Sequence, residues 1–220
     1  KKKKNNFFFE FIILIVIRFI YLIYKIAKDT IFSKTSFHRP ISNIDTFIVS
    51  HITNPKQIKE TEDTYFGKVA NRKNSIILLI NHTKVSSSTL NRENNDPKKI
   101  ILSNKISSKE EIYIFLSIVL NSFYLIINIF TTKNFIKKNF LKDLSLDLLA
   151  RRTSFSIRVS LEIKNLIEYY RPKIIITTFE GYSWEKLTYH FSKKVYKNIL
   201  CIGYQHSTIL KDENSMRKKI

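Results

Sequence analysis

Glycine and cysteine are both scarce in this chain. Gly67, Gly181 and Gly203 are the only glycines among 220 residues, and Cys201 is the single cysteine. One cysteine allows no disulfide within the chain, which suits a reducing cytoplasm, and a cysteine inside an apolar run usually packs as a small core residue. Where glycine is so rare, each one is either an ordinary turn residue or stands where a Cβ would not be tolerated.

Several motifs that identify common enzyme classes are missing too. The chain has no G-x-G-x-x-G and no P-loop motif, which argues against a standard dinucleotide or P-loop site. It has no G-x-S-x-G, which argues against an α/β-hydrolase. One cysteine and scattered histidines give no zinc-binding spacing, so we expect no metal site.

Acidic residues are few. Asp and Glu number 18 against 38 Lys and Arg, so the formal net charge is +20. An anionic partner is therefore expected: a membrane surface, a phosphorylated lipid carrier, a sugar nucleotide or a nucleic acid. The basic residues are dispersed and no nucleic-acid-binding module is recognisable, so we expect no specific nucleic acid.

The first 40 residues combine charge with a long apolar run. Lys1–Lys4 precede residues 7–27, which are long enough to span a bilayer. Glu10, Arg18 and Lys25 interrupt this run, and charges within a span are costly. Three interpretations stay open: a helix lying in or anchored to the membrane, a true span, and a core helix of the fold.

Short β-branched runs alternate with helical patterns along the rest of the chain, which predicts an α/β fold with a Rossmann-like parallel sheet flanked by helices. The predicted strands are 45–50, 75–80, 98–102, 173–178 and 198–202. The predicted helices include 61–72, 144–170 and one capped by Ser183, whereas 84–96 is predicted to be a polar loop. Cys201 is expected in a buried strand. Arg151, Arg152 and Arg158 are expected on a solvated helix face, or else to bind phosphate.

A second apolar stretch occupies residues 112–130, after a helix start that Ser107 or Ser108 would cap with Glu110 and Glu111 in the first turn. Its length permits a transmembrane interpretation, but we favour a buried or membrane-apposed helix because strands lie on both sides. The basic and aromatic stretch 133–142 either lies on a membrane or forms a solvated surface helix.

Polar residues follow the predicted strands repeatedly. Ser50-His51, Asn81-His82 and Ser103-Asn104 end the first three strands, and Glu180-Gly181 and Gly203-Tyr204-Gln205 follow the last two. Because the carboxyl ends of parallel strands form the ligand-binding edge of an open α/β sheet, we expect a site there. Taken singly, each histidine at a strand end is as well explained by a structural role or simple exposure.

The segment 180–207 also resembles a known group. Its pattern is E-x-x-x-W-E, a helix, a strand and then G-x-Q-H-S, which resembles bacterial surface-carbohydrate biosynthesis proteins described as glycosyltransferases of the GT-B type. Weaker likeness extends to Ser50-His51, to residues 63–67 and to residues 80–82, so the resemblance covers about residues 45–210. It implies the N-terminal Rossmann-like domain of a GT-B fold and a metal-independent transferase. The absence of a D-x-D cluster agrees, because metal-dependent GT-A transferases use one.

The resemblance also implies the chemistry of the site. The donor would be a nucleotide-sugar, with no cofactor, and the acceptor a surface polysaccharide or another glycan, or a lipid-linked sugar. Inverting transfer needs a base for the acceptor hydroxyl, and Glu180 and His206 are the candidates. The remaining candidate substrate-binding residues are Gly181, Trp184, Glu185, Gly203, Gln205, Ser207, His51, Gly67 and His82. Trp184 could present its ring to a sugar or pack in the core.

We therefore divide the chain into an N-terminal helix with its connector (1–40), a Rossmann-like domain (41–210) and the start of a linker (211–220) to a second domain that we expect the sequence to lack. We expect a cytoplasmic protein, peripheral or anchored at the inner face of the cytoplasmic membrane, whose partner is an anionic membrane surface. The alternative function is a non-catalytic, membrane-associated scaffold with half of a transferase fold.

Overall fold

The computed structural model describes residues 11–21, 23–24, 27, 44–103 and 105–205, and these form two compact units. A helical unit holds the described residues within 1–35 and 106–157. A sheet unit holds those within 36–105 and 158–220. The predicted linker segment 211–220 lies outside the described residues.

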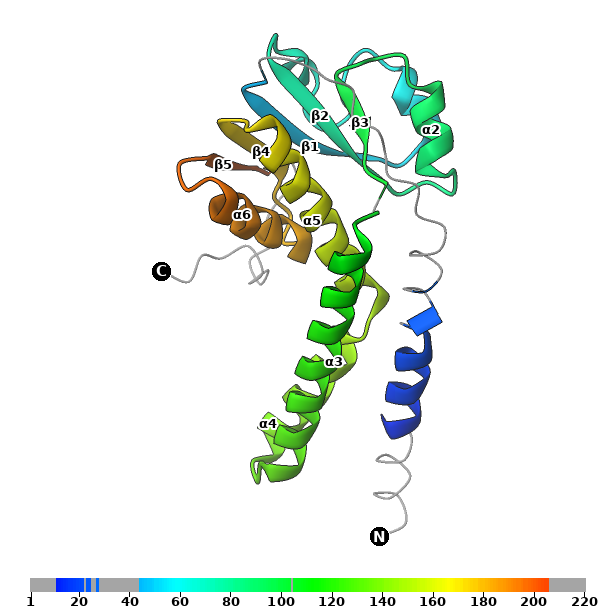
Figure 1. Ribbon diagram of the computed structural model, residues 1–220, viewed down its shortest axis with the longest axis vertical. Coiled ribbons are helices and arrows are strands. Elements are labelled where there is room, and N and C mark those ends of the chain that lie inside the picture. The colour runs from blue at the N-terminus through cyan, green and yellow to red at the C-terminus, as the bar shows by residue number, and fades with distance from the viewer. Residues whose placement is uncertain (1–10, 22, 25–26, 28–43, 104, 206–220) are drawn as a thin grey trace. The chain divides into compact units, whose positions relative to one another are not determined.

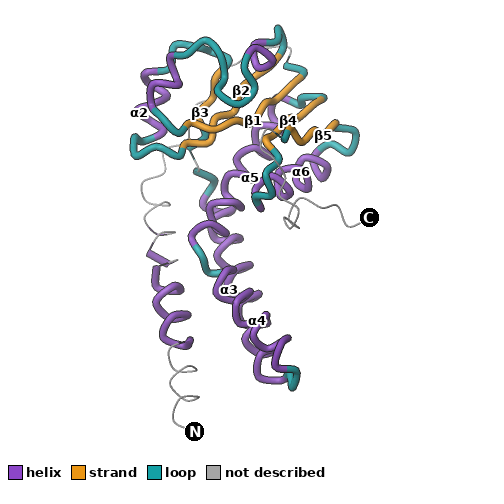
Figure 2. The backbone as a smooth tube through the Cα atoms, turned by 180° about the vertical axis from the view of Figure 1, so that it is seen from behind, coloured by secondary structure: helices purple, strands orange, loops and turns teal. Residues whose placement is uncertain are grey.

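The sheet unit contains five parallel strands, which confirms the predicted Rossmann-like α/β class (Figures 1 and 2). The strands are β1 (Thr46–Ile52), β2 (Ser75–Asn81), β3 (Lys99–Ile101), β4 (Ile174–Thr178) and β5 (Leu200–Tyr204), in the order β3-β2-β1-β4-β5. β1 and β2 are buried along nearly their whole length, as expected for β-branched runs covered on both faces.

The strand order reverses between β1 and β4. From β1 the chain proceeds outward through β2 to β3, and later it returns to place β4 on the other side of β1. Thr46 pairs with Ser75 of β2 on one side and with Ile174 of β4 on the other. In open α/β sheets this reversal point opens a crevice at the carboxyl ends of the strands, where ligands bind.

The sheet unit also contains α2 (Ser87–Glu93), α6 (Ser183–Val195) and, from residue 158 on, α5 (Arg151–Tyr170). α5 packs in the core through one apolar side, because Val159, Ile163, Leu166 and Ile167 are all fully buried. Ile48, Ile52, Ile77 and Leu79 from β1 and β2 pack with Leu90 of α2 in a second part of the core.

The helix predicted for 61–72 is wrong. The segment is a turn closed by a bridge between Asp63 and Gly67, followed by the short 3-10 helix η2 (Lys68–Asn71). The Asp63 carboxylate accepts hydrogen bonds from the backbone N–H of Tyr65 and of Phe66, at 2.9 Å each, so it competes with helical bonding. Gly67 has φ +52°, outside the helical region.

Two further predictions about helices need correction. Residues 84–96 are not a loop throughout, because they contain α2, which Ser86 caps and which buries Leu90. Residues 144–170 are not one helix, because α4 (Phe135–Leu148) ends before α5 begins at Arg151. At this break the Asp147 carbonyl accepts from the Ala150 N–H at 3.1 Å and from the Thr153 hydroxyl at 2.6 Å.

Three single-residue predictions are also wrong. Arg158 is 1% exposed, so it does not share the solvated face of Arg151 and Arg152. Cys201 is only half-buried, because β5 pairs with β4 alone among the described strands and is largely exposed. The residue that caps α6 is Tyr182 and not Ser183, which is the first helical residue.

The helical unit contains the N-terminal helix Phe11–Tyr21, α3 (Ser108–Thr131) and α4. Ser107, one of the two predicted caps, caps α3 and also forms a capping box with Glu110. Phe11, Ile129 and Leu141 bring the three helices together in a small core. The Arg18 guanidinium donates to the Leu146 carbonyl of α4, which gives this charge a polar partner within the unit.

Among the described residues, α3 is the helix that is long and apolar enough to cross a membrane, judged by length and composition. The N-terminal helix is apolar but shorter. The stretch 133–142 continues into α4, whose side chains Phe135, Ile136 and Phe140 are exposed.

Candidate functional site

A row of hydrogen-bonded side chains crosses the reversal point of the sheet. His51, near the end of β1, places Nδ1 2.9 Å from Nε2 of His82, which follows β2. On its other side, Nε2 of His51 lies 3.0 Å from the hydroxyl of Thr178, the last residue of β4. The Thr178 hydroxyl in turn lies 3.5 Å from Oε1 of Glu185, so its bond to this carboxylate is long. Three strands and the start of α6 thus contribute to one chain of polar groups.

The chemistry of these groups determines which atom donates and which atom accepts in each hydrogen bond of the row. An ionised carboxylate only accepts hydrogen bonds, so Thr178 donates to Glu185 and accepts from Nε2–H of His51. Nδ1 of His51 is then an acceptor, and Nε2–H of His82 donates to it. In this arrangement Nδ1 is the unprotonated nitrogen of His82, which is the exposed residue of the row.

Glu185 also holds the loop between β4 and α6. It is fully buried, and its carboxylate accepts from the backbone N–H of Glu180 at 3.0 Å, of Gly181 at 3.0 Å and of Tyr182 at 2.9 Å. Gly181 has φ +90°, a conformation that side-chain-bearing residues rarely adopt. The three hydrogen bonds to Glu185 and the positive φ of Gly181 together fix the backbone at Glu180.

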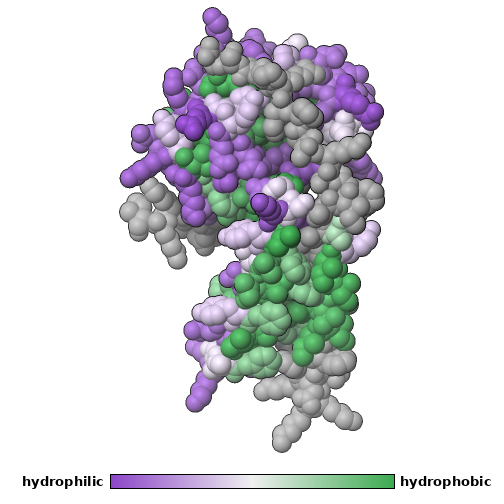
Figure 3. All heavy atoms as spheres, in the orientation of Figure 1, coloured by the Kyte–Doolittle hydropathy of each residue, from purple (hydrophilic) through white to green (hydrophobic). Residues whose placement is uncertain are grey.

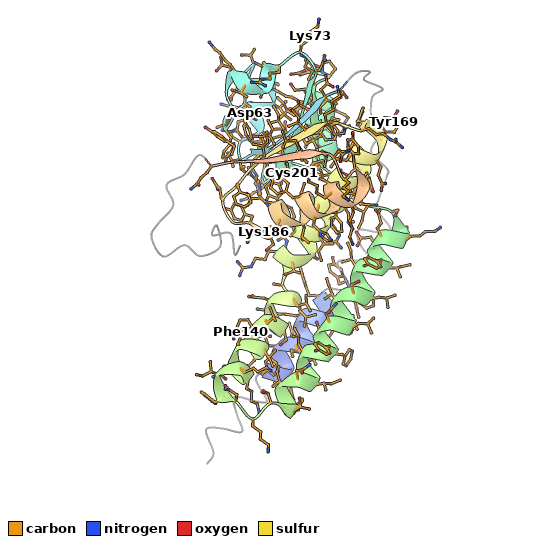
Figure 4. All side chains as sticks on the ribbon, turned by 90° about the vertical axis from the view of Figure 1, so that its left-hand side faces the viewer. Asp63, Lys73, Phe140, Tyr169, Lys186 and Cys201 are labelled. Atoms are coloured by element: carbon orange, nitrogen blue, oxygen red, sulfur yellow. The ribbon has the colours of Figure 1, made fainter. Side chains whose placement is uncertain are left out.

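A second fixed turn lies at the same edge of the sheet. The Ser50 hydroxyl of β1 donates to the buried Asp63 carboxylate at 2.9 Å, which ties the turn 63–67 to the strand. Asp63 is labelled in Figure 4. The Tyr65 ring from this turn packs edge-on against His51, with 5.2 Å between ring centroids.

His51 is enclosed by aromatic rings and is itself buried. Its ring centroid lies 5.5 Å from that of Trp184 in an edge-on contact, and Trp184 is also buried. Trp184 therefore packs in the core beside the histidine, which is one of the two alternatives that the sequence left open.

The pKa shifts follow from this enclosure. Burial raises the pKa of the Glu185 carboxyl, although its bonds from backbone N–H groups act in the opposite sense. Although His82 is exposed as a residue, the partial burial of its imidazole lowers its pKa, so the neutral form is favoured. Burial raises the pKa of Tyr65, and the negative charge of Glu180 raises it further. The last effect places Glu180 within electrostatic range of the turn after β1.

The two remaining glycines of the predicted site have different roles. A Cβ on Gly203 of β5 would lie 2.8 Å from Cβ of Phe179, so β5 can approach the β4–α6 loop only because position 203 lacks a side chain. A Cβ on Gly67 would meet no atom within 4 Å, and its positive φ is what requires glycine there.

β5 contributes to the same edge. The ring of Tyr204 packs against the Phe66 ring of the turn 63–67, with 5.2 Å between the ring centroids. Gln205 follows at the end of the strand and is half-buried. The predicted residues His206 and Ser207 lie outside the described residues, so their predicted roles stay predictions.

A small cavity lies next to the row. Its volume is about 10 Å³, roughly the size of one water molecule, and it lies beside His51, Asp63 and Lys99. Within the described ranges, no group of three or more His, Cys, Asp or Glu side chains is arranged to hold a metal ion.

The sequence predicts that the site lies at the strand ends, but it does not identify two of the site residues, Thr178 and Asp63. The sequence predicts Thr178 as a strand residue and Asp63 as part of the helix 61–72 and of the weaker likeness over 63–67, but it predicts no site role for either. A threonine as the last residue of a predicted buried strand is a usable signal, because its hydroxyl lies at the edge of the sheet where the polar residues of the other strand ends gather.

Comparisons with known proteins identify no relative. No protein-family model, no curated protein and no solved structure matches this chain.

Proposed function

We propose that the sheet unit is the acceptor-side half of a glycosyltransferase that moves a sugar from a nucleotide-sugar to a hydroxyl of a surface polysaccharide or lipid-linked acceptor. The observation that carries this proposal is the hydrogen-bonded row His82–His51–Thr178–Glu185 across the reversal point of the sheet. The resemblance of residues 180–207 to surface-carbohydrate transferases is its second support.

His82 has the properties of a general base for this reaction. Its lowered pKa keeps the imidazole neutral near pH 7, and the row behind it fixes the tautomer with Nδ1 unprotonated. In the transfer, the acceptor oxygen bonds to the anomeric carbon as its proton passes to the base. The bond from that carbon to the phosphate oxygen breaks, and the nucleoside diphosphate leaves.

Glu180 is the second candidate base, and it could instead bind acceptor hydroxyls. The Glu185 carboxylate holds the backbone of Glu180 in place. The Glu180 carboxylate lies close enough to Tyr65 to raise the pKa of that phenol. His206 keeps the role that the sequence predicts for it, as base or phosphate contact. Gln205 is a candidate for hydrogen bonding to the sugar.

The test uses the full-length protein with a panel of sugar nucleotides and glycan acceptors. We expect His82→Gln to lower turnover by about 10²–10⁴-fold if this imidazole is the base, with donor affinity changed little. Glu180→Gln tests the other candidate in the same assay. Asn198→Ala, at an exposed position before β5, is the matched control and should leave turnover unchanged.

The results separate the two functions considered. Loss of turnover in His82→Gln or Glu180→Gln with a normal fold supports a transferase and shows which group is the base. If the full-length protein binds no sugar nucleotide and transfers no sugar, the transferase proposal fails and the non-catalytic scaffold is favoured.

A further inference from the structure

Helix α3 carries a continuous row of exposed apolar side chains along its whole length. Between 49% and 67% of each of these residues is exposed, although all are large and hydrophobic. We call this row the apolar stripe; its members are Ile112, Tyr113, Leu116, Leu120, Phe123, Tyr124, Ile127 and Phe130. Soluble surfaces rarely leave so many large apolar groups side by side without a binding partner.

The apolar stripe lies on one side of the helix. At 100° per residue its eight members fall within about 120° of the helix circumference. The buried residues of α3, among them Ile114, Ile118 and Ile129, fall on the opposite side, and Ile129 packs on Phe11 and Leu141 of the neighbouring helices. Figure 3 shows apolar side chains gathered over the helical unit.

The N-terminal helix enlarges the exposed apolar surface. Its exposed apolar side chains are Ile12, Ile13, Leu14, Val16, Ile17 and Ile20. The Phe19 ring packs on the Phe115 ring of α3, with 6.0 Å between the ring centroids. Two packed helices of the same unit therefore both present apolar side chains outward.

Three polar side chains of α3 donate hydrogen bonds to carbonyls of the same helix. The side-chain amide of Asn121 donates to the Ser117 carbonyl at 2.7 Å, and that of Asn128 donates to the Tyr124 carbonyl at 2.8 Å. Thr131 donates to the Ile127 carbonyl at 3.3 Å. Such bonds let polar residues lie at a lipid boundary, where water is scarce and donors need internal acceptors.

The charges that follow the apolar stripe in the sequence, up to Lys142, have a single sign. From Ile112 to Lys142 the sequence contains four lysines and no acidic residue. Lys133, Lys137 and Lys138 are exposed at the end of α3 and the start of α4. Apolar surface flanked by lysines matches the acyl chains and anionic headgroups of a membrane. A second copy in parallel orientation would bring lysines to meet these lysines.

We propose that the helical unit binds an anionic lipid bilayer by inserting the apolar stripe of α3 into one leaflet, with both ends of α3 on the same side of the membrane. The helix lies in the plane of the interface. Its buried side stays packed on α4 and the N-terminal helix.

The packing of α4 argues against a span by α3. A connection of three residues, 132–134, joins the helices, and α4 returns along α3, as the Ile129–Leu141 contact requires (Figure 2). If α3 crossed the bilayer, α4 would have to cross back. It spans only about 21 Å against about 30 Å of hydrocarbon. Each charge placed at the bilayer centre lowers the insertion equilibrium about a hundredfold, and α4 carries Lys137, Lys138, Lys142, Asp143 and Asp147.

The first test measures binding of the full chain to preformed vesicles by flotation, with equal parts of phosphatidylcholine and phosphatidylglycerol. We expect Leu120→Glu and Phe123→Glu each to lower the partition coefficient by about tenfold or more, because apolar burial is lost. Asn121→Glu adds the same charge at an exposed position off the apolar stripe. This control should lower the partition coefficient by about fivefold at most. Equal losses in all three variants, or none, would overturn the proposal.

Two further measurements distinguish insertion from its alternatives. Bound protein should stay on the vesicles in about 1 M salt, where surface charges are screened; release would show purely electrostatic binding and refute insertion. In a Cys201→Ser background, Lys133→Cys should react with an impermeant maleimide added outside the vesicles. Protection of this cysteine until detergent is added would show a span and would contradict the in-plane arrangement.

A second copy is the remaining competitor for the apolar stripe. Light scattering of the wild type and of Leu120→Glu reports the oligomeric state. If Leu120→Glu separates a dimer into monomers and leaves vesicle binding unchanged, the stripe is an interface between copies and the proposal is refuted.

Discussion

Replacing Glu185 by alanine should destabilise the sheet unit strongly, even though Glu185 is a charged residue. Its carboxylate accepts the backbone N–H groups of Glu180, Gly181 and Tyr182 at 2.9–3.0 Å, and these donors lose their acceptor in Glu185→Ala. A donor left unpaired costs about 1–3 kcal/mol. The loop is only partly buried, so water can reach it and the lower figure applies. We expect a loss of about 3 kcal/mol.

Glu185→Gln separates hydrogen bonding from charge. The amide keeps one acceptor oxygen, so we expect this substitution to lower the free energy of unfolding by about 1–2 kcal/mol. Lys194→Ala, at an exposed position on the same helix, is the control and should change stability by less than about 0.5 kcal/mol. Urea unfolding followed by circular dichroism gives these differences.

The pH dependence of the same variants checks the burial of the carboxyl. Because the folded-state pKa of Glu185 is raised above its ordinary value of 4.5, proton binding favours the folded state. This contribution is fully present below about pH 4.5 and is lost as the pH rises through the folded-state pKa. The stability difference between wild type and Glu185→Gln should therefore shrink as the pH rises. The reasoning is refuted if Glu185→Ala costs less than about 1 kcal/mol, or if the glutamine variant loses as much as the alanine variant.

Two other predictions concern the same edge of the sheet. Gly203→Ala should lower the free energy of unfolding by about 1–3 kcal/mol, because the new Cβ would lie 2.8 Å from Cβ of Phe179. Thermal unfolding measures this loss. An unchanged melting temperature would show that β5 and the β4–α6 loop separate freely. The NMR titration of His82 should show a midpoint below 6.5, with the histidine-linked stability present above pH 6.5 and lost as the pH falls through the lowered pKa. A midpoint at or above 6.5 would contradict the enclosure of this ring.

The ionisation of the histidine pair is restricted by its geometry as well. Nδ1 of His51 and Nε2 of His82 lie 2.9 Å apart, so one of the two nitrogens must lack a proton for a hydrogen bond to form. Two fully protonated rings would place N–H against N–H. The spacing and the lowered pKa of His82 therefore agree that at least one ring is neutral.

Much of the fold could be predicted from the sequence because its signals are local. The β-branched run 173–178 corresponds to β4, and the Ser107–Glu110 capping box marks the start of α3. Where local signals compete, prediction failed. Residues 61–72 contain a helical pattern, but the Asp63 side chain and the positive φ of Gly67 form a turn instead.

Only the tertiary structure decided which strand ends meet. β1 and β4 are more than 100 residues apart in sequence, and nothing in either segment specifies that they pair. Their pairing creates the bond between His51 and Thr178, and with it the row that includes His82. The folded structure also buries Glu185 and Arg158, although both are charged residues.

The sequence by itself determined the strands, the main helices and the polar residues at strand ends, because backbone preference and side-chain periodicity act over a few neighbouring residues. The tertiary structure alone decided the strand order, the hydrogen-bonded row and the exposed apolar side of α3. These depend on contacts between distant segments, whose free energy appears only when the chain has packed.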